Sequence, residues 1–220
     1  MTQYPYIHKI ADRVKSELSN AEAGHDWLHI NRVLKNALLI SETESESQNE
    51  VVILSALLHD IADSKFHNGD ENIGPFVAEN IMSEFGVPDH IKKKVILIIQ
   101  NISFKGGFND TEYTSIELNI VRDADRLDAI GGIGIARAFT YGGYKNRRLY
   151  DPEIKPAQYE DKEGYKQNIS PTINHFYEKL LKLKDLMQTN KGKQMADERH
   201  KFMLDFLDHF YEETGFNPFN

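Results

Sequence analysis

The 220-residue sequence contains no cysteine, which excludes disulfide bonds and thiolate metal sites. This absence favours a reducing compartment. The sequence also lacks a long apolar stretch, since its longest strongly apolar runs, 51–58 and 95–99, are far shorter than the roughly 20 residues that span a bilayer. Its first residues contain no apolar signal-peptide core. These absences predict a cytoplasmic protein without a membrane partner.

Positive charge is scarce as well, because 26 Lys and Arg residues stand against 34 Asp and Glu residues and give a formal net charge of -8. A globally acidic protein is a poor non-specific binder of nucleic acid. Hydrophobic residues make up 40% and charged residues 27% of the chain, which is typical of globular proteins. We therefore expect a single domain over 1–220 and no nucleic-acid partner.

Strand patterns are nearly absent, whereas apolar residues recur at helical spacing along most of the chain. The apolar run 51–61 fits a buried strand or a buried helix, and its eleven residues without a turn residue favour a helix. The pattern predicts an all-α helical bundle with a core over about 6–144. The expected helices cover 6–19, 28–40, 51–61, 71–85, 89–99, 112–138, 171–189 and 194–213, with the last two packed on the core.

Glycines interrupt the sixth of these helices at Gly131, Gly132 and Gly134, which indicates close helix packing or a break. The segment 141–170 then changes composition, with several glycines and prolines among many charges. It predicts a long loop, and loops of this length are often functional. The loop contains a basic patch that could grip a polyphosphate or could simply be solvated: Lys145, Arg147 and Arg148.

Histidine and aspartate residues on separate predicted helices could converge on a metal ion. A divalent metal in a helical bundle takes imidazole and carboxylate ligands from several helices. The candidates are His29, the pair His59-Asp60 and Asp125. The pair follows the apolar run VVILSALL, and a carboxylate at the end of a buried helix must be compensated. A metal ion is one compensation, and a helix cap or an ion pair is the other.

Other polar residues lie about one helical turn from these candidates. Asp63, at i+4 from His59, could orient or deprotonate a metal-bound water, or could be an exposed turn residue. Arg32, at i+3 from His29, could contact a phosphate or a carboxylate, or lie on the surface. His25 precedes the predicted N-cap residue Asp26, so it need not share the face of His29, and we assign it a supporting position behind the ligands.

Three segments, GHDWLHINRV, ALLHDIADSKF and VRDADRLDAIGGIGIARAFTYGG, together resemble the HD-domain phosphohydrolase superfamily, and within it small stand-alone bacterial hydrolases. The resemblance covers about 6–144 and implies an HD-domain-like helical bundle there. It implies one divalent metal ion held by four residues: His29, His59, Asp60 and Asp125. Such a ligand set accepts Mn, Co, Ni, Fe, Zn or Mg.

Two other branches of the superfamily differ from this sequence. The Gly-Tyr-Pro motif and extended histidine set of the cyclic-dinucleotide phosphodiesterases are absent, and only part of the Glu-Asp feature of the alarmone hydrolases survives at 61–64. The resemblance therefore implies hydrolysis of a phosphate ester or anhydride, with a nucleotide as the expected substrate and nucleoside triphosphate pyrophosphohydrolysis as one form. A metal-poor nucleotide sensor, a phosphomonoesterase on a non-nucleotide metabolite and a helical interaction module are the alternatives.

Under this interpretation, Asp60, Asp63 and Lys65 are the catalytic candidates. The substrate-binding candidates are Arg32, Lys65, Arg122 and Tyr141, with Arg126, Asn101 and Phe104 as weaker ones. The substrate, the metal and the oligomeric state stay open, a homodimer included.

Overall fold

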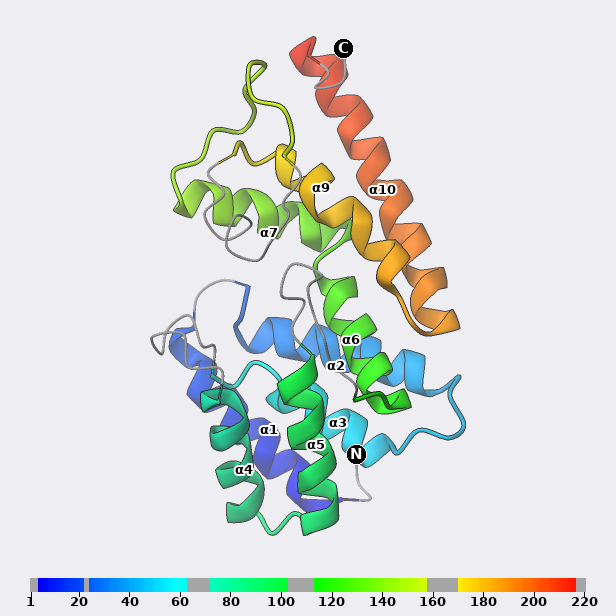
Figure 1. Cartoon of the computed structure of the whole chain (residues 1–220). Helices are drawn as coiled ribbons and strands as arrows, with labels where there is room; N and C mark the ends of the chain where they lie inside the picture. The colour runs from blue at the N-terminus through cyan, green and yellow to red at the C-terminus, as the bar shows by residue number, and fades with distance from the viewer. Residues whose placement is uncertain (1–3, 22–23, 63–71, 103–112, 158–169, 217–220) are drawn as a thin grey trace. The chain divides into compact units, whose positions relative to one another are not determined.

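The computed structural model describes the chain except for residues 1–3, 22–23, 63–71, 103–112, 158–169 and 217–220 (Figure 1). The described residues contain helices and no strand, which confirms the all-α prediction. They form two compact units, of which the first comprises the described residues of Met1–Ser103 and Thr111–Asp125 and the second those of Arg126–Asn220. The prediction of a single domain over 1–220 stays a prediction. In the described part of the chain, no helix combines the length and the apolar character that crossing a membrane requires.

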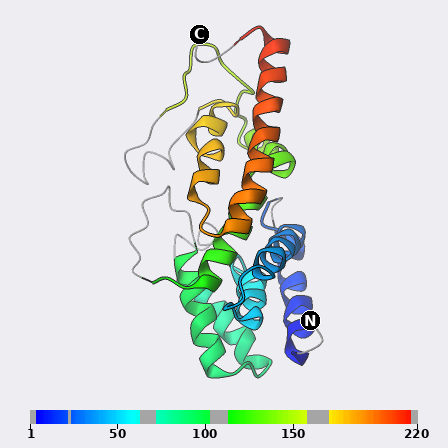
Figure 2. The ribbon, with the colours of Figure 1, turned by 90° about the vertical axis from the view of Figure 1, so that its right-hand side faces the viewer.

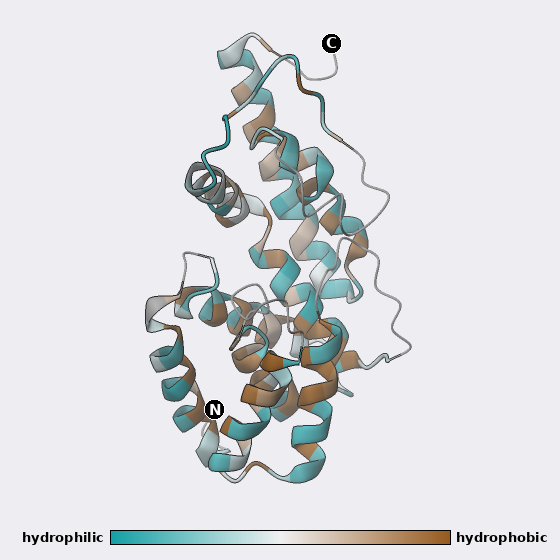
Figure 3. Cartoon of the chain, turned by 60° about the vertical axis from the view of Figure 1, so that its left-hand side comes forward, coloured by the Kyte–Doolittle hydropathy of each residue, from teal (hydrophilic) through white to brown (hydrophobic). Residues whose placement is uncertain are grey.

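The first unit is built around one helix that is buried from Val51 to its end. Its elements are α1 (Pro5–Glu17), the 3-10 helix η1 (Leu18–Asn20), α2 (Trp27–Ser41), α3 (Asn49–Leu58), α4 (Ile73–Glu84), α5 (Asp89–Asn101) and most of α6 (Ile116–Asp128). Helix α3 contacts α1, α2 and α5, and every residue from Val51 to Leu58 is buried. Figure 3 shows hydrophobic and hydrophilic residues mixed along the helices of the chain. A helix whose residues are apolar all round belongs inside a protein. This burial fixes the end of α3, where His59 follows.

Helix α2 begins where the sequence predicts. The side chain of Asp26 accepts a hydrogen bond of 2.9 Å from the backbone N–H of His29, which confirms Asp26 as the N-cap. A capping carboxylate satisfies one of the four N–H groups that the first helical turn leaves without a partner. The cap therefore holds the first turn of α2, the turn that carries His29.

The predicted helix over 112–138 is two helices, α6 and α7 (Gly131–Tyr144). Gly131 has a φ of 72°, a conformation that L side chains rarely adopt. A Cβ atom on Gly134 would collide with the carbonyl oxygen of Ala129. The break that the sequence left open therefore occurs at Gly131, and the chain comes close to itself at Gly134. Arg137 closes the corner by an ion pair of 2.7 Å with Asp128.

The second unit contains α7, α9 (Asn174–Glu178), the 3-10 helix η4 (Leu180–Leu186) and α10 (Asn190–Thr214). Helix α10 contacts α7 and η4, and Figure 2 shows its length beside α9 and η4. The second unit contains an aromatic cluster in which the ring centroids of contacting pairs lie 5.7 to 6.1 Å apart: Phe139, Phe176, Phe206 and Phe210.

Two predictions for the second unit were wrong in part. The expected helix over 171–189 is the short α9 followed by η4. Leucines recur every third residue at 180, 183 and 186, which matches the three residues per turn of a 3-10 helix. The expected loop over 141–170 begins later, because α7 extends to Tyr144. Residues 145–157 are without helix or strand, and 158–169 lie outside the described residues.

Candidate metal centre

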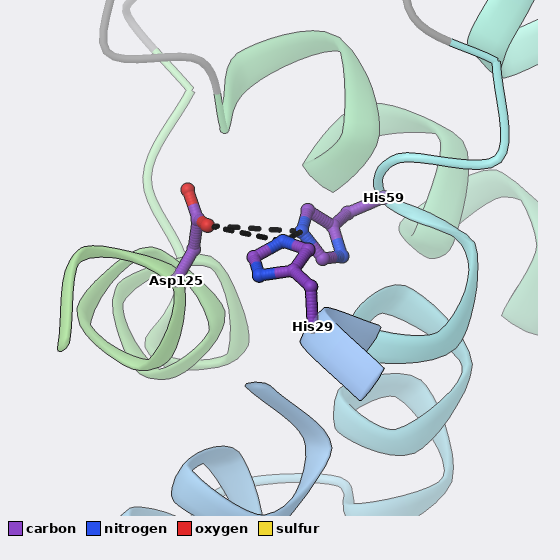
Figure 4. Close-up of side chains that lie close together, drawn as sticks. All are labelled: His29, His59 and Asp125. Atoms are coloured by element: carbon purple, nitrogen blue, oxygen red, sulfur yellow. Dashed lines mark hydrogen bonds and ion pairs between the residues drawn. The ribbon is translucent and has the colours of Figure 1, made fainter. Parts of the chain in front are cut away.

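Three helices of the first unit bring His29, His59 and Asp125 together. One ligand atom from each of the three lies within 4.8 Å of the others. The Nε2 atoms of the two histidines are 3.3 Å apart, and Asp125 Oδ1 lies 3.7 Å from Nε2 of His29 and 3.8 Å from Nε2 of His59. Figure 4 shows the three side chains pointing toward one another from α2, the end of α3 and α6. Residues separated by up to 96 positions thus meet at one point.

Asp60 adds a fourth oxygen to this cluster. Its Oδ2 atom lies 3.4 Å from Nε2 of His29 and 3.7 Å from Nε2 of His59. Its side chain is 28% exposed, whereas the two histidine side chains are each 1% exposed. The structure therefore brings all four predicted metal ligands together, with both imidazoles buried and the carboxylates nearer to solvent.

The main chain sets the orientation of His59. Its Nδ1 atom lies 2.9 Å from the carbonyl oxygen of Ala56. Because a carbonyl can only accept a hydrogen bond, Nδ1 must carry a proton, and in a neutral imidazole Nε2 then offers a lone pair. Metal-binding histidines commonly have their second ring nitrogen fixed in this way. His59 thus presents the nitrogen that a metal requires toward His29 and the carboxylates.

The spacing of the four atoms suits one cation. Ligands at about 2.0–2.2 Å from a single ion stand roughly 3–4.2 Å from each other, and the five separations above, 3.3 to 3.8 Å, fall in that range. Two carboxylates this close to each other repel one another unless positive charge lies among them. The residues present therefore fit a divalent ion with nitrogen and oxygen ligands.

The electrostatics of the cluster favour ionised carboxylates. Burial by itself would raise the pKa of Asp60, but the nearby His59 and His29 outweigh burial and lower that pKa. The pKa of Asp125 is lowered in the same way, with His59 as its main partner against burial. Burial lowers the pKa of His59, yet Asp60 and Asp125 outweigh burial, and the net result is a raised pKa. Without a metal, His59 therefore holds a proton more tightly than an exposed imidazole does.

Some predicted site residues cannot be placed. Asp63, Lys65 and Phe104 lie outside the described residues. Arg32 is half-buried on α2, one turn after His29. His25 is close to the cluster, with its ring centroid 6.1 Å from that of His29, but it is not among the three residues whose ligand atoms converge.

The structure places three further candidates, and two of them, Arg122 and Arg126, donate hydrogen bonds to main-chain carbonyls. Arg122 donates from Nε, at 3.2 Å, and from Nη2 to the carbonyl of Asn101 at the end of α5. Arg126 donates to the carbonyl of Leu186, a structural contact to the main chain. Tyr141 lies in the second unit and is 47% exposed.

Sequence reasoning missed Asn36. This buried residue on α2 donates from Nδ2 to the carbonyl oxygen of Ala124 at 3.3 Å, directly before Asp125 on α6. It lies at i+7 from His29 and so on the same face of the helix. An amide on the apolar face of α2 was the available signal, but the sequence does not reveal its partner 88 residues away.

The sequence matches a known protein family over the region that contains this cluster. The family model of the HD domain matches residues 27–130, a range that contains all four candidate ligands. The uncharacterized protein YpgQ of Bacillus subtilis is 38% identical over 208 residues, covering 94% of this chain and 93% of the relative.

Solved structures are similar over almost the whole chain. A crystal structure of an HD-superfamily hydrolase from Bacillus thuringiensis is 42% identical, with a TM-score of 0.75 over 95% of this chain and 96% of that one. The crystal structure of Bacillus subtilis YpgQ in complex with ADP is 35% identical in the structural alignment, with a TM-score of 0.76 over 97% of each chain. Because the family model matches and these relatives align over nearly their whole length, the chain belongs to the HD-domain family.

Proposed function

We propose that the chain is a metal-dependent phosphohydrolase that acts on a nucleotide or a related phosphate ester or anhydride. The observation that carries the proposal is the convergence of His29, His59, Asp60 and Asp125, with separations that fit one divalent ion. Two relatives support the choice of reaction and substrate class, since one is an HD-superfamily hydrolase and another was crystallised with ADP.

A divalent ion, when bound, supplies Lewis-acid activation of a water molecule and neutralises charge on the phosphate. His29 and His59 would hold it by Nε2, and Asp60 and Asp125 by carboxylate oxygens. The lowered pKa values of both carboxylates keep them ionised at neutral pH, so they are ready to bind without losing a proton.

The remaining roles are assigned mainly to residues that are close to the ligands in sequence. Asp63 is proposed to orient the attacking water, and Lys65 and Arg32 to pair with phosphate oxygens. Arg122 lies at i-3 from Asp125 and therefore on the same face of α6. Its Nε and Nη2 groups donate to Asn101, and both N–H groups of Nη1 remain as donors for a phosphate. Tyr141 is proposed to contact the substrate as well.

A product-resolved screen tests the proposed reaction. Nucleoside mono-, di- and triphosphates would each be incubated with Mn, Co, Ni or Mg, and phosphate and pyrophosphate would be measured separately. We expect hydrolysis of at least one nucleotide with at least one metal, and none after chelator treatment. Nucleotide binding without turnover under every metal would instead favour a sensor, and turnover confined to non-nucleotide monoesters would favour a phosphomonoesterase.

Asp63 gives a second test, which separates chemistry from metal binding. The Asp63→Asn variant should turn over on the order of 10²- to 10⁴-fold more slowly, the range typical of a lost general base, while its metal content stays that of the unaltered protein. Metal analysis of the purified variant checks this. A matching loss of metal would make Asp63 a ligand.

A further inference from the structure

Helix α7 ends in a reversal that places two cations over one tyrosine ring. Asn146 has a left-handed backbone, with φ 54°. The N–H of Arg147 donates to the carbonyl of Gly142 at 2.8 Å, and the N–H of Asn146 donates to that of Gly143 at 3.0 Å. This pair of bonds is a Schellman cap. It turns the chain back so that Arg147 lies 5.7 Å from the ring centroid of Tyr141.

Lys145 completes this arrangement. Its Nζ atom lies 5.7 Å from the ring centroid of Tyr141 and 5.0 Å from that of Tyr144. Tyr144 is 73% exposed, and Arg148 keeps a side chain that is 76% exposed while it pairs with Asp151. We call these five residues the α7 cationic surface: Tyr141, Tyr144, Lys145, Arg147 and Arg148.

The charge of this segment is opposite to that of the chain. From 137 to 150 there are four Arg or Lys residues and no Asp or Glu, although the formal net charge of the chain is -8. The buried His175 lies in the same positive surroundings: burial and, after it, the charges of Lys179 and Arg147 together lower its pKa to about 3. An anion would therefore be attracted to this part of the second unit.

Helix capping explains only part of this pattern. Cations near a helix C-terminus complement the negative end of its dipole, and one such residue suffices. Capping requires neither two exposed tyrosine rings nor cations stacked on them. Exposed aromatic rings beside cations are, however, the combination that binds nucleotides, because every base can stack on a ring while phosphates pair with the cations.

We propose that the α7 cationic surface binds a nucleoside phosphate, with the base stacked on Tyr144 and the phosphates paired with Lys145 and Arg148. The proposal rests on the proposed function only for the choice of a nucleotide as the ligand. It assigns nucleotide binding to residues of the second unit that are independent of the candidate metal ligands.

Calorimetric titration of the full chain with ADP tests this assignment. The titration uses the Asp60→Ala variant in the presence of a chelator, so that a metal site cannot contribute and hydrolysis is not measured. In this background, Tyr144→Ala and Lys145→Glu should each weaken ADP binding on the order of tenfold. Tyr144→Phe and Lys145→Arg, which keep the ring and the charge, should restore the affinity.

A matched charge reversal serves as the control. Lys193 is exposed in the first turn of α10, and Lys193→Glu should leave the affinity for ADP unchanged. If Lys193→Glu weakened ADP binding as much as Lys145→Glu does, the effect would come from the overall charge of the chain, which would overturn the proposal. So would absent ADP binding in the Asp60→Ala background, or an affinity that neither Tyr144→Ala nor Lys145→Glu changes. Loss of the hydrolytic function alone would leave these titrations unaffected.

Discussion

Replacement of Asp60 with alanine is expected to abolish both metal binding and phosphohydrolase activity. Asp60 Oδ2 lies 3.4 Å and 3.7 Å from the two imidazole Nε2 atoms, so its loss removes one of two negative charges from the cluster. Metal-assisted activation contributes several kcal/mol to catalysis, and about 4 kcal/mol corresponds to a loss on the order of 10³-fold in rate. Metal analysis of the purified variant and its rate in the phosphate-release assay measure the two effects.

A second carboxylate variant controls for general loss of charge. Asp89 on α5 has an 85% exposed side chain that pairs with Lys92 at 2.9 Å. Exposed ion pairs contribute little to stability, so Asp89→Ala should keep the metal, the activity and the fold. Circular dichroism would establish that the Asp60→Ala variant is folded. Full activity in a folded Asp60→Ala variant would refute the proposed metal site.

Much of the candidate site was predictable because its residues stand beside sequence patterns that can be recognised without knowing the fold. His59 and Asp60 directly follow an apolar run whose burial is complete, and a charged pair in that position needs compensation. Asp26 is recognisable as a cap from its residue type and its place before an amphipathic helix. The sequence therefore indicated which helices would carry the candidate ligands, and the structure brings their side chains together.

The features that were missed depend on contacts that are distant in sequence or on backbone conformation. The end of α6 could not be located because glycine permits both a continuing helix and a left-handed break, and only the structure shows φ 72° at Gly131. The 3-10 helix η4 was predicted as α-helix, because a leucine-rich stretch of seven residues fits both periods. The cap at Asn146, which brings Arg147 back over Tyr141, is likewise invisible in the residue pattern.

Asn36 connects two of the helices that carry the candidate ligands. Its Nδ2 atom donates to the carbonyl of Ala124, so a hydrogen bond joins α2, which carries His29, to α6 beside Asp125. A shift of one helix against the other would change the separation of 3.7 Å between His29 and Asp125. Asn36 thus acts on the cluster through the helices, without belonging to it.

We expect Asn36→Leu to weaken metal affinity by roughly 10- to 100-fold, the usual consequence of losing a residue that supports metal ligands. Leucine is similar in size, so it limits the cavity, and the lost hydrogen bond itself destabilises the fold by only about 1 kcal/mol. Titration with Mn²⁺ followed by electron paramagnetic resonance gives the affinity, and thermal unfolding gives the stability.

Ser41 offers a control on the same helix. Its buried side chain hydrogen-bonds to Ser47 and Asn49, neither of which belongs to the cluster. Ser41→Ala should therefore lower stability by a similar amount and leave the Mn²⁺ affinity unchanged. If Asn36→Leu lowers stability but binds Mn²⁺ as tightly as the unaltered chain, Asn36 only stabilises the packing of α2 on α6. A loss of affinity confined to Asn36→Leu would instead show that the hydrogen bond to Ala124 determines the distance between His29 and Asp125.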